Sequence, residues 1–322
     1  MIAPEARAAL VAAANRAPSV HNIQPTRFAF EPNAIVLTQD PARRLHVGDP
    51  EGRDNLKSLG AIIEGLALAL SERNIAVHAT HQADGARLTL SEGASPDPLA
   101  PFAEPRSAHR GLFAKPNAAH REALARLAAA CPDLHIIANE TEIASLARFY
   151  DEVSLQVLRD APYRAELLSW MRLSKNHPDY HRDGLNAEAM ALSPFEAAGA
   201  QIVLGPRAFP ALDALAAAGP LIAESAKVKS AAALALFHRP AAEHEIETGR
   251  RFYRIWLEIE REGLALCPQS VLADQPAAAA RLMRDANLGA DRKLVTVFRI
   301  GARPPGAKIP PRARLPATEL IL

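Results

Sequence analysis

Two prolines, Pro18 and Pro25, bound the segment that most constrains how this chain begins to fold. Proline fixes φ and has no backbone N–H, so the alanine-rich helical pattern of residues 4–15 cannot continue through them. The residues between the prolines are mostly short and polar, which favours a fixed turn. We therefore expect this turn to hold polar side chains such as Ser19 and Asn22 toward another part of the molecule.

The composition is that of a globular protein with no strong charge bias. Of 322 residues, 49% are hydrophobic and 23% are charged, which is enough for one large core or two modest ones. The 37 basic and 36 acidic residues give a net charge of +1. This balance argues against nucleic acid or an anionic membrane surface as the partner, and it favours a small molecule.

The cysteines and the amino terminus bear on the compartment. Cys131 and Cys267 lie far apart in sequence, which suits buried thiols in a reducing compartment better than a disulfide-stapled fold. The amino terminus lacks the basic start and continuous apolar run of a signal peptide, and the most apolar stretch, residues 59–70, is interrupted by Glu64. The sequence therefore predicts a cytoplasmic protein without a membrane span.

Helical patterns dominate the chain. The clearest covers residues 244–262, where an apolar stripe ends at Gly263, and Asp49-Pro50 predicts the start of another helix that runs to Leu70. Further helices are expected at residues 4–15, 118–130, 141–158, 208–217 and 274–286. Strands are expected at residues 27–30, 35–38, 87–90, 135–138, 231–237 and 294–300. Strands scattered among long helices indicate an α+β fold.

Two irregular segments organise the chain. Residues 93–105 are rich in proline and alanine with little periodicity, which predicts a linker between a shorter half, 1–100, and a longer half, 101–322. Residues 304–316 are proline-rich and basic, and we expect them to form an extended arm over the surface of the fold.

Three segments after the linker carry groups suited to a bound anion. Arg106 and Arg110 follow the linker directly, and guanidinium groups are natural partners for phosphate. Residues 263–271 follow the clearest helix, and their backbone N–H groups are potential donors. The arm contains Arg312 and Arg314. The plain alternatives are a charged surface turn, a helix exit into a buried loop and a solvated tail, and for the Pro18–Pro25 turn a capped loop.

The amino-terminal turn and the first arginine segment resemble motifs of the nitroreductase family, whose members hold FMN at a dimer interface. Residues 17–25 are similar to Ala-Pro-Ser-x-x-Asn-x-Gln-Pro-Trp, with Thr26 in the place of the tryptophan. Residues 106–110 are similar to Arg-x-Ser-x-Lys/Arg, with Ala108 in the place of the central serine, so a hydroxyl contact is missing unless Ser107 replaces it.

The two later segments carry the same resemblance. Residues 263–270 are similar to the family's Gly-Leu-Gly segment and Pro-x-Glu-Gly turn, whose backbone N–H donates to flavin N5, with Gln269-Ser270 in the place of Glu-Gly. Residues 310–316 are similar to the Lys-x-Arg-x-Pro arm that returns to the FMN phosphate. The cofactor-binding residues implied by the resemblance are Pro18, Ser19, His21, Asn22, Gln24, Arg106, Arg110, Pro268, Gln269, Ser270, Arg312 and Arg314.

The resemblance also implies a role for each group. Arg106, Arg312 and Arg314 would hold the phosphate, and Arg110 would stabilise the reduced ring. Ser19, Asn22 and Gln24 would orient the ring from the other half, with the pyrimidine edge or ribityl chain as their partner. No side chain need act as a catalytic acid or base, because flavin N5 carries the hydride.

In family homodimers, one subunit supplies the arginine motif, the N5 turn and the basic arm, while the partner supplies the Pro-Ser-x-x-Asn motif. This chain has the partner's motif only before the linker and the other three only after it. The resemblance therefore implies a nitroreductase-like fold of two related halves fused as a pseudo-dimer, with antiparallel or mixed sheets flanked by helices. A monomer with one complete site is expected, as in a fused subgroup that includes mycobacterial Acg-type proteins.

Some of that subgroup are thought to have lost FMN behind an internal lid. Residues 170–192, which have little regular periodicity, are either such a lid or a plain surface insertion. No Rossmann, Walker or Gly-x-Ser-x-Gly motif is present, and Pro178 separates His177 from His181, so a dinucleotide fold, a serine hydrolase and a dedicated metal site are disfavoured.

The resulting expectation is an FMN-dependent oxidoreductase that transfers hydride from NADH or NADPH to a small acceptor such as a nitroaromatic or a quinone. The second reading is a catalytically degenerate protein of the same fold that sequesters flavin or acts as a stress-response binding module. A third is a flavin-dependent biosynthetic enzyme. The sequence does not show which electron acceptor such an enzyme would reduce.

Overall fold

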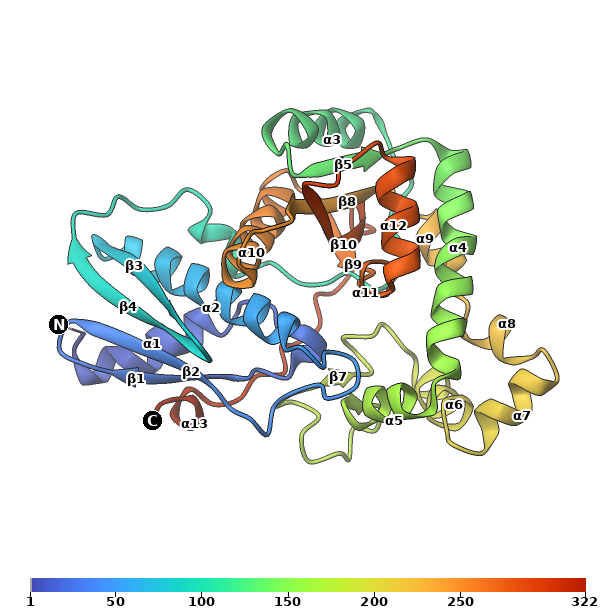
Figure 1. Ribbon diagram of the computed structural model, residues 1–322, viewed down its shortest axis with the longest axis horizontal. Helices are drawn as coiled ribbons and strands as arrows, with labels where there is room; N and C mark the ends of the chain where they lie inside the picture. Colours follow the sequence, from blue (N-terminus) through green and yellow to red (C-terminus); the bar gives the residue numbers. More distant parts are fainter. Residues whose placement is uncertain (1) are drawn as a thin grey trace.

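The computed structural model describes residues 2–322 and contains two four-stranded antiparallel sheets, one from each half of the chain (Figure 1). The first sheet has the order β1-β2-β4-β3, built from β1 (Thr26–Phe30), β2 (Ala34–Gln39), β3 (Ile75–Gln82) and β4 (Gly85–Glu92). The second has the order β5-β8-β10-β9, built from β5 (Leu134–Ile137), β8 (Ala233–Pro240), β9 (Ala265–Pro268) and β10 (Arg292–Gly301). A short parallel pair, β6 (Met171–Arg172) and β7 (Leu185–Asn186), lies apart from both. The predicted α+β class, with antiparallel sheets flanked by helices, is confirmed.

The two halves repeat one order of elements. In the first half, α1 (Pro4–Ala14) precedes β1 and β2, α2 (Arg53–Ser71) follows them, and β3 and β4 close the sheet. In the second, α3 (Ala118–Ala130) precedes β5 and β8, α10 (Glu245–Arg261) follows them, and β9 and β10 close the sheet. When β1, β2, β3 and β4 are matched with β5, β8, β9 and β10, the two sheets have the same strand order. The topology is therefore an internal repeat.

The second half carries long insertions into this repeat. Between β5 and β8 lie α4 (Glu140–Arg159), α5 (Ala161–Ser169), α6 (Pro194–Val203), α7 (Ala208–Ala214), α8 (Ala218–Ile222) and α9 (Ser225–Lys229). Between β9 and β10 lie α11 (Val271–Asp274) and α12 (Pro276–Asp285), and α13 (Ala317–Leu320) ends the chain. Single 3-10 turns occur at Val20–Asn22 and Ala100–Ala103.

Helices α2 and α10 cross at the centre of the molecule, and glycine makes the crossing possible. A Cβ on Gly60 would lie 1.9 Å from the Ile246 carbonyl oxygen, and a Cβ on Gly249 would lie 2.0 Å from the Lys57 carbonyl oxygen. Lys57, which opposes Gly249, lies three residues before Gly60, and Ile246, which opposes Gly60, lies three residues before Gly249. The two halves thus meet through a reciprocal contact like that of a twofold interface.

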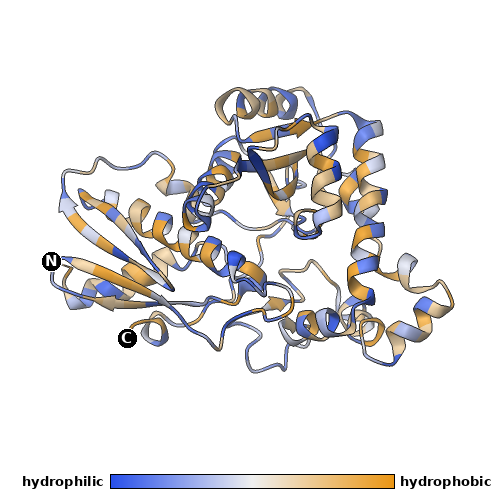
Figure 2. Ribbon diagram, in the orientation of Figure 1, coloured by the Kyte–Doolittle hydropathy of each residue, from blue (hydrophilic) through white to orange (hydrophobic). Residues whose placement is uncertain are grey.

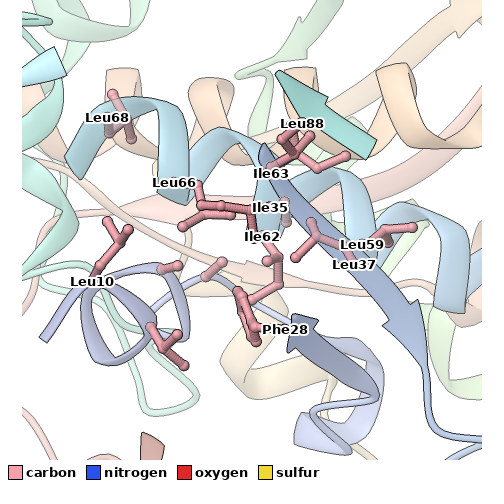
Figure 3. Close-up of a cluster of buried hydrophobic side chains, with 14 of the residues drawn as sticks. Leu10, Phe28, Ile35, Leu37, Leu59, Ile62, Ile63, Leu66, Leu68 and Leu88 are labelled. Atoms are coloured by element: carbon pink, nitrogen blue, oxygen red, sulfur yellow. The ribbon is translucent and has the colours of Figure 1, made fainter. Parts of the chain in front are cut away.

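Separate cores stabilise the halves. The first lies between its sheet and helices α1 and α2, where Phe28, Ile35 and Leu66 are fully buried (Figure 3). Residues from α10, such as Tyr253 and Leu257, also pack into it. The second sheet has a buried cluster on each side, one with α3 and α10 and one with α4 and α12. Apolar and polar residues alternate along these helices, as one-sided burial requires (Figure 2).

The carboxyl-terminal arm crosses from the second half to the first. Residues 302–316 contain no helix or strand, so the predicted extended arm is confirmed. At its end the Leu322 N–H donates to the Phe28 carbonyl at 2.9 Å, which adds a bridge to the edge of β1. The arm therefore belongs by sequence to the half after residue 100 but lies against the half before it. The division at residue 100 stays a prediction.

Several predicted elements differ from the structure. Helix α2 begins at Arg53 rather than at Pro50, because the Asp49 carboxylate reaches forward to accept from the Asp54 and Asn55 N–H groups at 2.9 and 3.1 Å. The helix predicted at 208–217 is α7, which begins at Ala208 but ends three residues earlier, at Ala214. Strands β3 and β9 were missed. Among residues 2–322, none of the helices combines the length and apolar character needed to cross a bilayer.

Candidate functional site

A cavity of about 400 Å³ lies between the two halves, and segments from both line it. The first half contributes the Pro18–Asn22 turn and the amino-terminal part of α2. The second contributes residues 106–110, the end of β9 with the following turn, and the arm. Of the predicted residues, those that line the cavity are Pro18, Ser19, His21, Asn22, Arg106, Arg110, Pro268, Gln269, Ser270, Arg312 and Arg314. The four segments that the sequence singled out therefore meet in space.

The Pro18–Pro25 turn has an unusual backbone. Residues His21, Asn22 and Gln24 have φ values of 41°, 56° and 51°, a left-handed conformation that non-glycine residues seldom adopt. The Gln24 N–H donates to Ser19 Oγ at 3.1 Å, and the Val20 N–H donates to Ser58 Oγ of α2 at 3.1 Å. Strained backbone that the surrounding structure maintains is concentrated at functional sites.

Gln24 does not line the cavity, so the structure gives no support to its predicted role as a flavin contact. Its side chain is buried, and its Oε1 accepts from Asn15 Nδ2 and the Leu315 N–H at 2.9 and 2.8 Å. Its Nε2 donates to the Arg182 carbonyl at 2.8 Å. The hydrogen-bonding groups of the amide join α1, the arm and residues 170–192. The side chain of Gln24 points into the protein, whereas Asn22 lines the cavity.

Asn22 lines the cavity, but its amide is also used within the protein. Its Nδ2 donates to the Gly184 and Ala313 carbonyls, each at 3.1 Å, and its Oδ1 accepts from Arg314 Nη1 at 2.6 Å. The side chain thus joins the turn to the arm and to residues 170–192. His21 differs, because its Nδ1 is buried without a partner among residues 2–322 and burial lowers its pKa.

Arg106 is buried at 3% exposure in the cavity wall. Its guanidinium lies 4.4 Å from the ring centre of Trp256 and donates to the Arg16 carbonyl, while its Nε has no partner among residues 2–322. Burial lowers its pKa. The adjacent Trp256 Nε1 is a second buried donor without an acceptor in the described part of the chain.

Arg312 and Arg314 complete a cluster of cations with Arg106. Burial, with repulsion from Arg106 as the next cause, lowers the pKa of Arg312 to about 10 and that of Arg314 to about 9. Arg312 donates to the carbonyls of residues 103, 104 and 106, and Arg314 donates to Asn22 Oδ1 and to carbonyls of the first half. Within residues 2–322, none of the three forms an ion pair with a carboxylate. The cluster, which we call the arginine cluster, therefore offers donors and positive charge without a counterion.

Residues 106–110 are held in place from the end of β10. Arg303 donates to the Ser107 carbonyl and to Ser107 Oγ at 3.1 and 3.2 Å, and it pairs with buried Glu260 at 2.8 Å. Ser107 Oγ is thus engaged by Arg303. Arg110 reaches across the cavity and donates to the Ala189 carbonyl at 3.2 Å.

In the turn after β9, the backbone N–H of Gln269 is engaged within the protein. The Gln269 N–H donates to the Val297 carbonyl at 2.7 Å, within the sheet, so it is not free for a ligand. The side chain is 3% exposed, lines the cavity, and has no partner for either Nε2 or Oε1 in residues 2–322. Ser270 is exposed and forms the first residue of the turn into α11.

Several lining residues were not identified from the sequence. Trp256 was assigned to the apolar stripe of its helix, and its indole N–H gave no signal. Asp54 and Lys57 form an ion pair at 2.7 Å on the cavity wall, and Tyr150 and Glu224 come from the insertion. The i,i+3 spacing of Asp54 and Lys57 is a detectable pattern, but it is equally typical of a solvated helix face.

Residues 170–192 cover part of the cavity. Gly184, Leu185, Ala189 and Met190 line it. The Gly184 N–H donates to the Asn22 carbonyl at 3.2 Å, and Asp183 pairs with Arg43 of the first half and with Arg172 at 2.9 and 2.8 Å. Across residues 2–322, no three His, Cys, Asp or Glu side chains gather in a way that could hold a metal ion.

Comparison with known proteins finds partial similarity to nitroreductases, the family that the sequence motifs resemble. No family model matches the chain. Over 71 residues it is 34% identical to the putative NAD(P)H nitroreductase acg of Mycobacterium tuberculosis, recorded for two strains. The chain resembles Acg-type nitroreductase-like proteins. The match covers 22% of this chain and 22% of Acg, so less than a quarter of that relative is matched.

Solved structures give weak matches of the same kind. An FMN and NADPH-dependent nitroreductase NfnB from Sphigopyxis sp. strain HMH is 15% identical, with 66% of this chain and 95% of that chain covered and a TM-score of 0.34. NfnB from Mycobacterium smegmatis in complex with NADPH is 16% identical, with 66% and 94% covered and a TM-score of 0.34. Iodotyrosine deiodinase bound to FMN and 3-iodo-L-tyrosine is 13% identical, with 66% and 94% covered and a TM-score of 0.37.

Proposed function

We propose that this protein is an FMN-dependent oxidoreductase and that the cavity between its halves is the FMN site. The observation that carries the proposal is the arginine cluster: Arg106, Arg312 and Arg314 line one cavity, and none of them pairs with a carboxylate in the described part of the chain. Like charges placed together away from water are unfavourable unless an anion joins them. A phosphate group supplies the negative charge that the cluster lacks.

The rest of the donor set fits FMN. Arg106 Nε and Trp256 Nε1 are buried donors without acceptors among residues 2–322, and both residues line the cavity. Arg110 would stabilise negative charge on the ring, and Ser270 begins the turn whose backbone would face N5. From the first half, Pro18, Ser19, His21 and Asn22 would bound the ring and ribityl chain. When bound, FMN supplies hydride transfer through N5 from NAD(P)H to a small acceptor such as a nitroaromatic or a quinone.

The protein's own part would be placement and electrostatics. The arginine cluster would anchor the anionic tail, the strained turn would fix one wall, and residues 184–190 would limit water on another. We further propose that the internal repeat is a fused pseudo-dimer, which supports a monomer with one complete site. The division at residue 100 and the cytoplasmic location remain part of this proposal. So do the eleven predicted residues that line the cavity as contacts, with Gln24 as a positioning residue.

The purified protein tests the proposal directly. It should be yellow, or should bind added FMN with quenching of flavin fluorescence, and denaturation should release FMN. A colourless protein that does not bind added FMN at micromolar concentrations would overturn the proposal. Size-exclusion chromatography with light scattering tests the monomer.

A second function has its own support in the contacts of residues 170–192. Asn22, Arg43 and Arg110 all bond to this segment, so the lid and the cavity wall are joined. Such a protein would bind flavin and keep it from reductant, as a sequestering or stress-response module. Anaerobic mixing of the flavin-loaded protein with NADPH separates the two functions. Bleaching of the flavin absorbance supports the oxidoreductase, and a spectrum that stays oxidised supports sequestration.

A further inference from the structure

The carboxylate of Glu260 lies beside the arginine cluster but is not part of it. Glu260 is 8% exposed near the end of α10, four residues after Trp256, whose ring centre lies 4.4 Å from the Arg106 guanidinium. Residues four apart share one face of a helix. The N–H of Ser107, the residue after Arg106, donates to Glu260 Oε1 at 3.4 Å. Glu260 therefore stands where it could become a counterion of Arg106.

Arg303 occupies both oxygens of this carboxylate. Its Nη1 and Nη2 donate to Glu260 Oε2 and Oε1 at 3.1 and 2.8 Å, which is a bidentate pair. The same guanidinium donates to the Ser107 carbonyl and Oγ at 3.1 and 3.2 Å. Neither Arg303 nor Glu260 is among the residues that line the cavity. The charge of Glu260 is thus cancelled by a cation outside the cavity wall.

A second carboxylate shows the same arrangement. The side chain of Glu104 pairs with Arg16, although the backbone carbonyl of Glu104 accepts from Arg312. Burial is the main cause that lowers the pKa of Arg106 and that of Arg312, and Glu260 and Glu104 respectively oppose these shifts. Glu104 is exposed, so water screens its charge, whereas buried Glu260 acts at fuller strength. Both carboxylates are held by an arginine outside the arginine cluster.

We propose that Arg303 is a positioning residue for phosphate recognition, because its pairing with Glu260 keeps that carboxylate from becoming the counterion of Arg106. The arginine cluster then keeps its charge for the phosphate of FMN. The inference rests on the proposed FMN site and deepens it, since it assigns the choice between an internal and an external anion to a residue that does not line the cavity. Arg303 acts on the phosphate end of the ligand and not on the flavin ring.

The test compares FMN with riboflavin, which has the same ring and ribityl chain but no phosphate, and obtains dissociation constants from quenching of flavin fluorescence. The wild-type protein should bind FMN at least about tenfold more tightly than riboflavin. Arg303→Met exposes the Glu260 charge to the cluster, so it should weaken FMN about tenfold and change riboflavin by less than about twofold. The double variant Arg303→Met/Glu260→Gln removes both charges and should bind FMN within about threefold of the wild type.

The double variant also protects the test against misfolding. Arg303→Met leaves a buried carboxylate without its partner, which destabilises the folded chain, whereas the double variant leaves no charge unpaired. If the single variant does not fold, the double variant alone decides, because a purely mechanical hold on Ser107 would be lost in it as well. The matched control is Arg126→Met/Glu262→Gln, which removes a pair at 2.8 Å outside the cavity lining and should bind both flavins as the wild type does.

Each outcome supports or overturns the inference. A double variant that binds FMN at least tenfold more weakly than the wild type would show that Arg303 acts by holding Ser107, and the FMN site would stand. An Arg303→Met variant that binds FMN like the wild type, or that loses riboflavin as strongly as FMN, would also overturn the inference alone. Equal binding of both flavins by the wild type would remove the phosphate from the arginine cluster. Failure of the wild type to bind FMN would overturn the proposed function and this inference together.

Discussion

Gly60 of α2 and Gly249 of α10 each remove the Cβ that would collide with the other helix, at 1.9 and 2.0 Å from a backbone carbonyl oxygen. Because backbone rather than a flexible side chain lies opposite each glycine, neither helix can yield locally. The halves can approach this closely only with glycine at both positions, and the cavity between them depends on that approach.

Gly60→Ala and Gly249→Ala should each destabilise the protein by roughly 1–3 kcal/mol or more, since an added methyl group forces the helices apart. Denaturant unfolding followed by circular dichroism measures the change. Gly199→Ala in α6 is the matched control, because its Cβ would meet nothing within 4 Å. There the better helix propensity of alanine should leave stability equal or higher by up to about 1 kcal/mol. Equal stability of all three variants would show that the crossing is looser than described.

Glu64 joins the same two helices by charge. It is 3% exposed on α2 and accepts from Arg250 and Arg254 of α10 at 3.1 and 2.7 Å. Glu64→Ala removes the buried acceptor that the two arginines share, while Arg254 keeps Asp97 at 2.8 Å and Arg250 keeps Glu247 at 3.5 Å, so we expect a loss of roughly 1–3 kcal/mol in unfolding free energy. Glu31→Ala removes the exposed partner of Arg87 and should produce little measurable change. A small effect at Glu64 would mean that water replaces the carboxylate.

The sequence predicted much of this arrangement, and the failures have physical causes. The predicted strands of the first sheet lie within one or two residues of β1 and β2, because these runs are rich in aromatic and β-branched residues. Strand β9 was missed because three buried residues and a half-buried proline, without alternation, become a strand only through pairing with β10, as between Cys267 and Arg299. Local sequence carries no record of that pairing.

The site shows the same division between local and tertiary information. Turn chemistry identified the Pro18–Pro25 segment, and guanidinium chemistry identified Arg106, Arg312 and Arg314. Sequence could not tell that Asn22 faces the cavity while Gln24 turns inward, since that depends on the left-handed backbone between them. Trp256 was missed because a tryptophan buried wholly in a core and one that also lines a cavity have the same sequence signature.

Arg106→Met should separate function from stability. Methionine keeps the apolar contact with Trp256 but removes a charge that lowers the pKa of Arg312 and Arg314 by repulsion. FMN affinity should fall by roughly 1.5–3 kcal/mol, measured by fluorescence quenching, because a charge-assisted hydrogen bond is lost. The unfolding temperature of the flavin-free protein should stay the same or rise. A lower unfolding temperature with unchanged FMN affinity would make Arg106 a structural cation and remove it from the site.

His21 should make stability depend on pH. Burial lowers its pKa from the ordinary value of 6.5, so below pH 6.5 the unfolded chain binds a proton that the folded chain still rejects. The stability associated with this residue is therefore complete above pH 6.5 and is lost as the pH falls toward the folded-state pKa. The slope from one proton is at most about 1.4 kcal/mol per pH unit. His21→Asn, which tolerates the left-handed backbone, should flatten the decline in unfolding free energy between pH 6.5 and 5. His46→Asn, at an exposed histidine, should leave the decline unchanged. If both variants follow the wild-type curve, the imidazole gains a proton in the folded cavity as readily as in water.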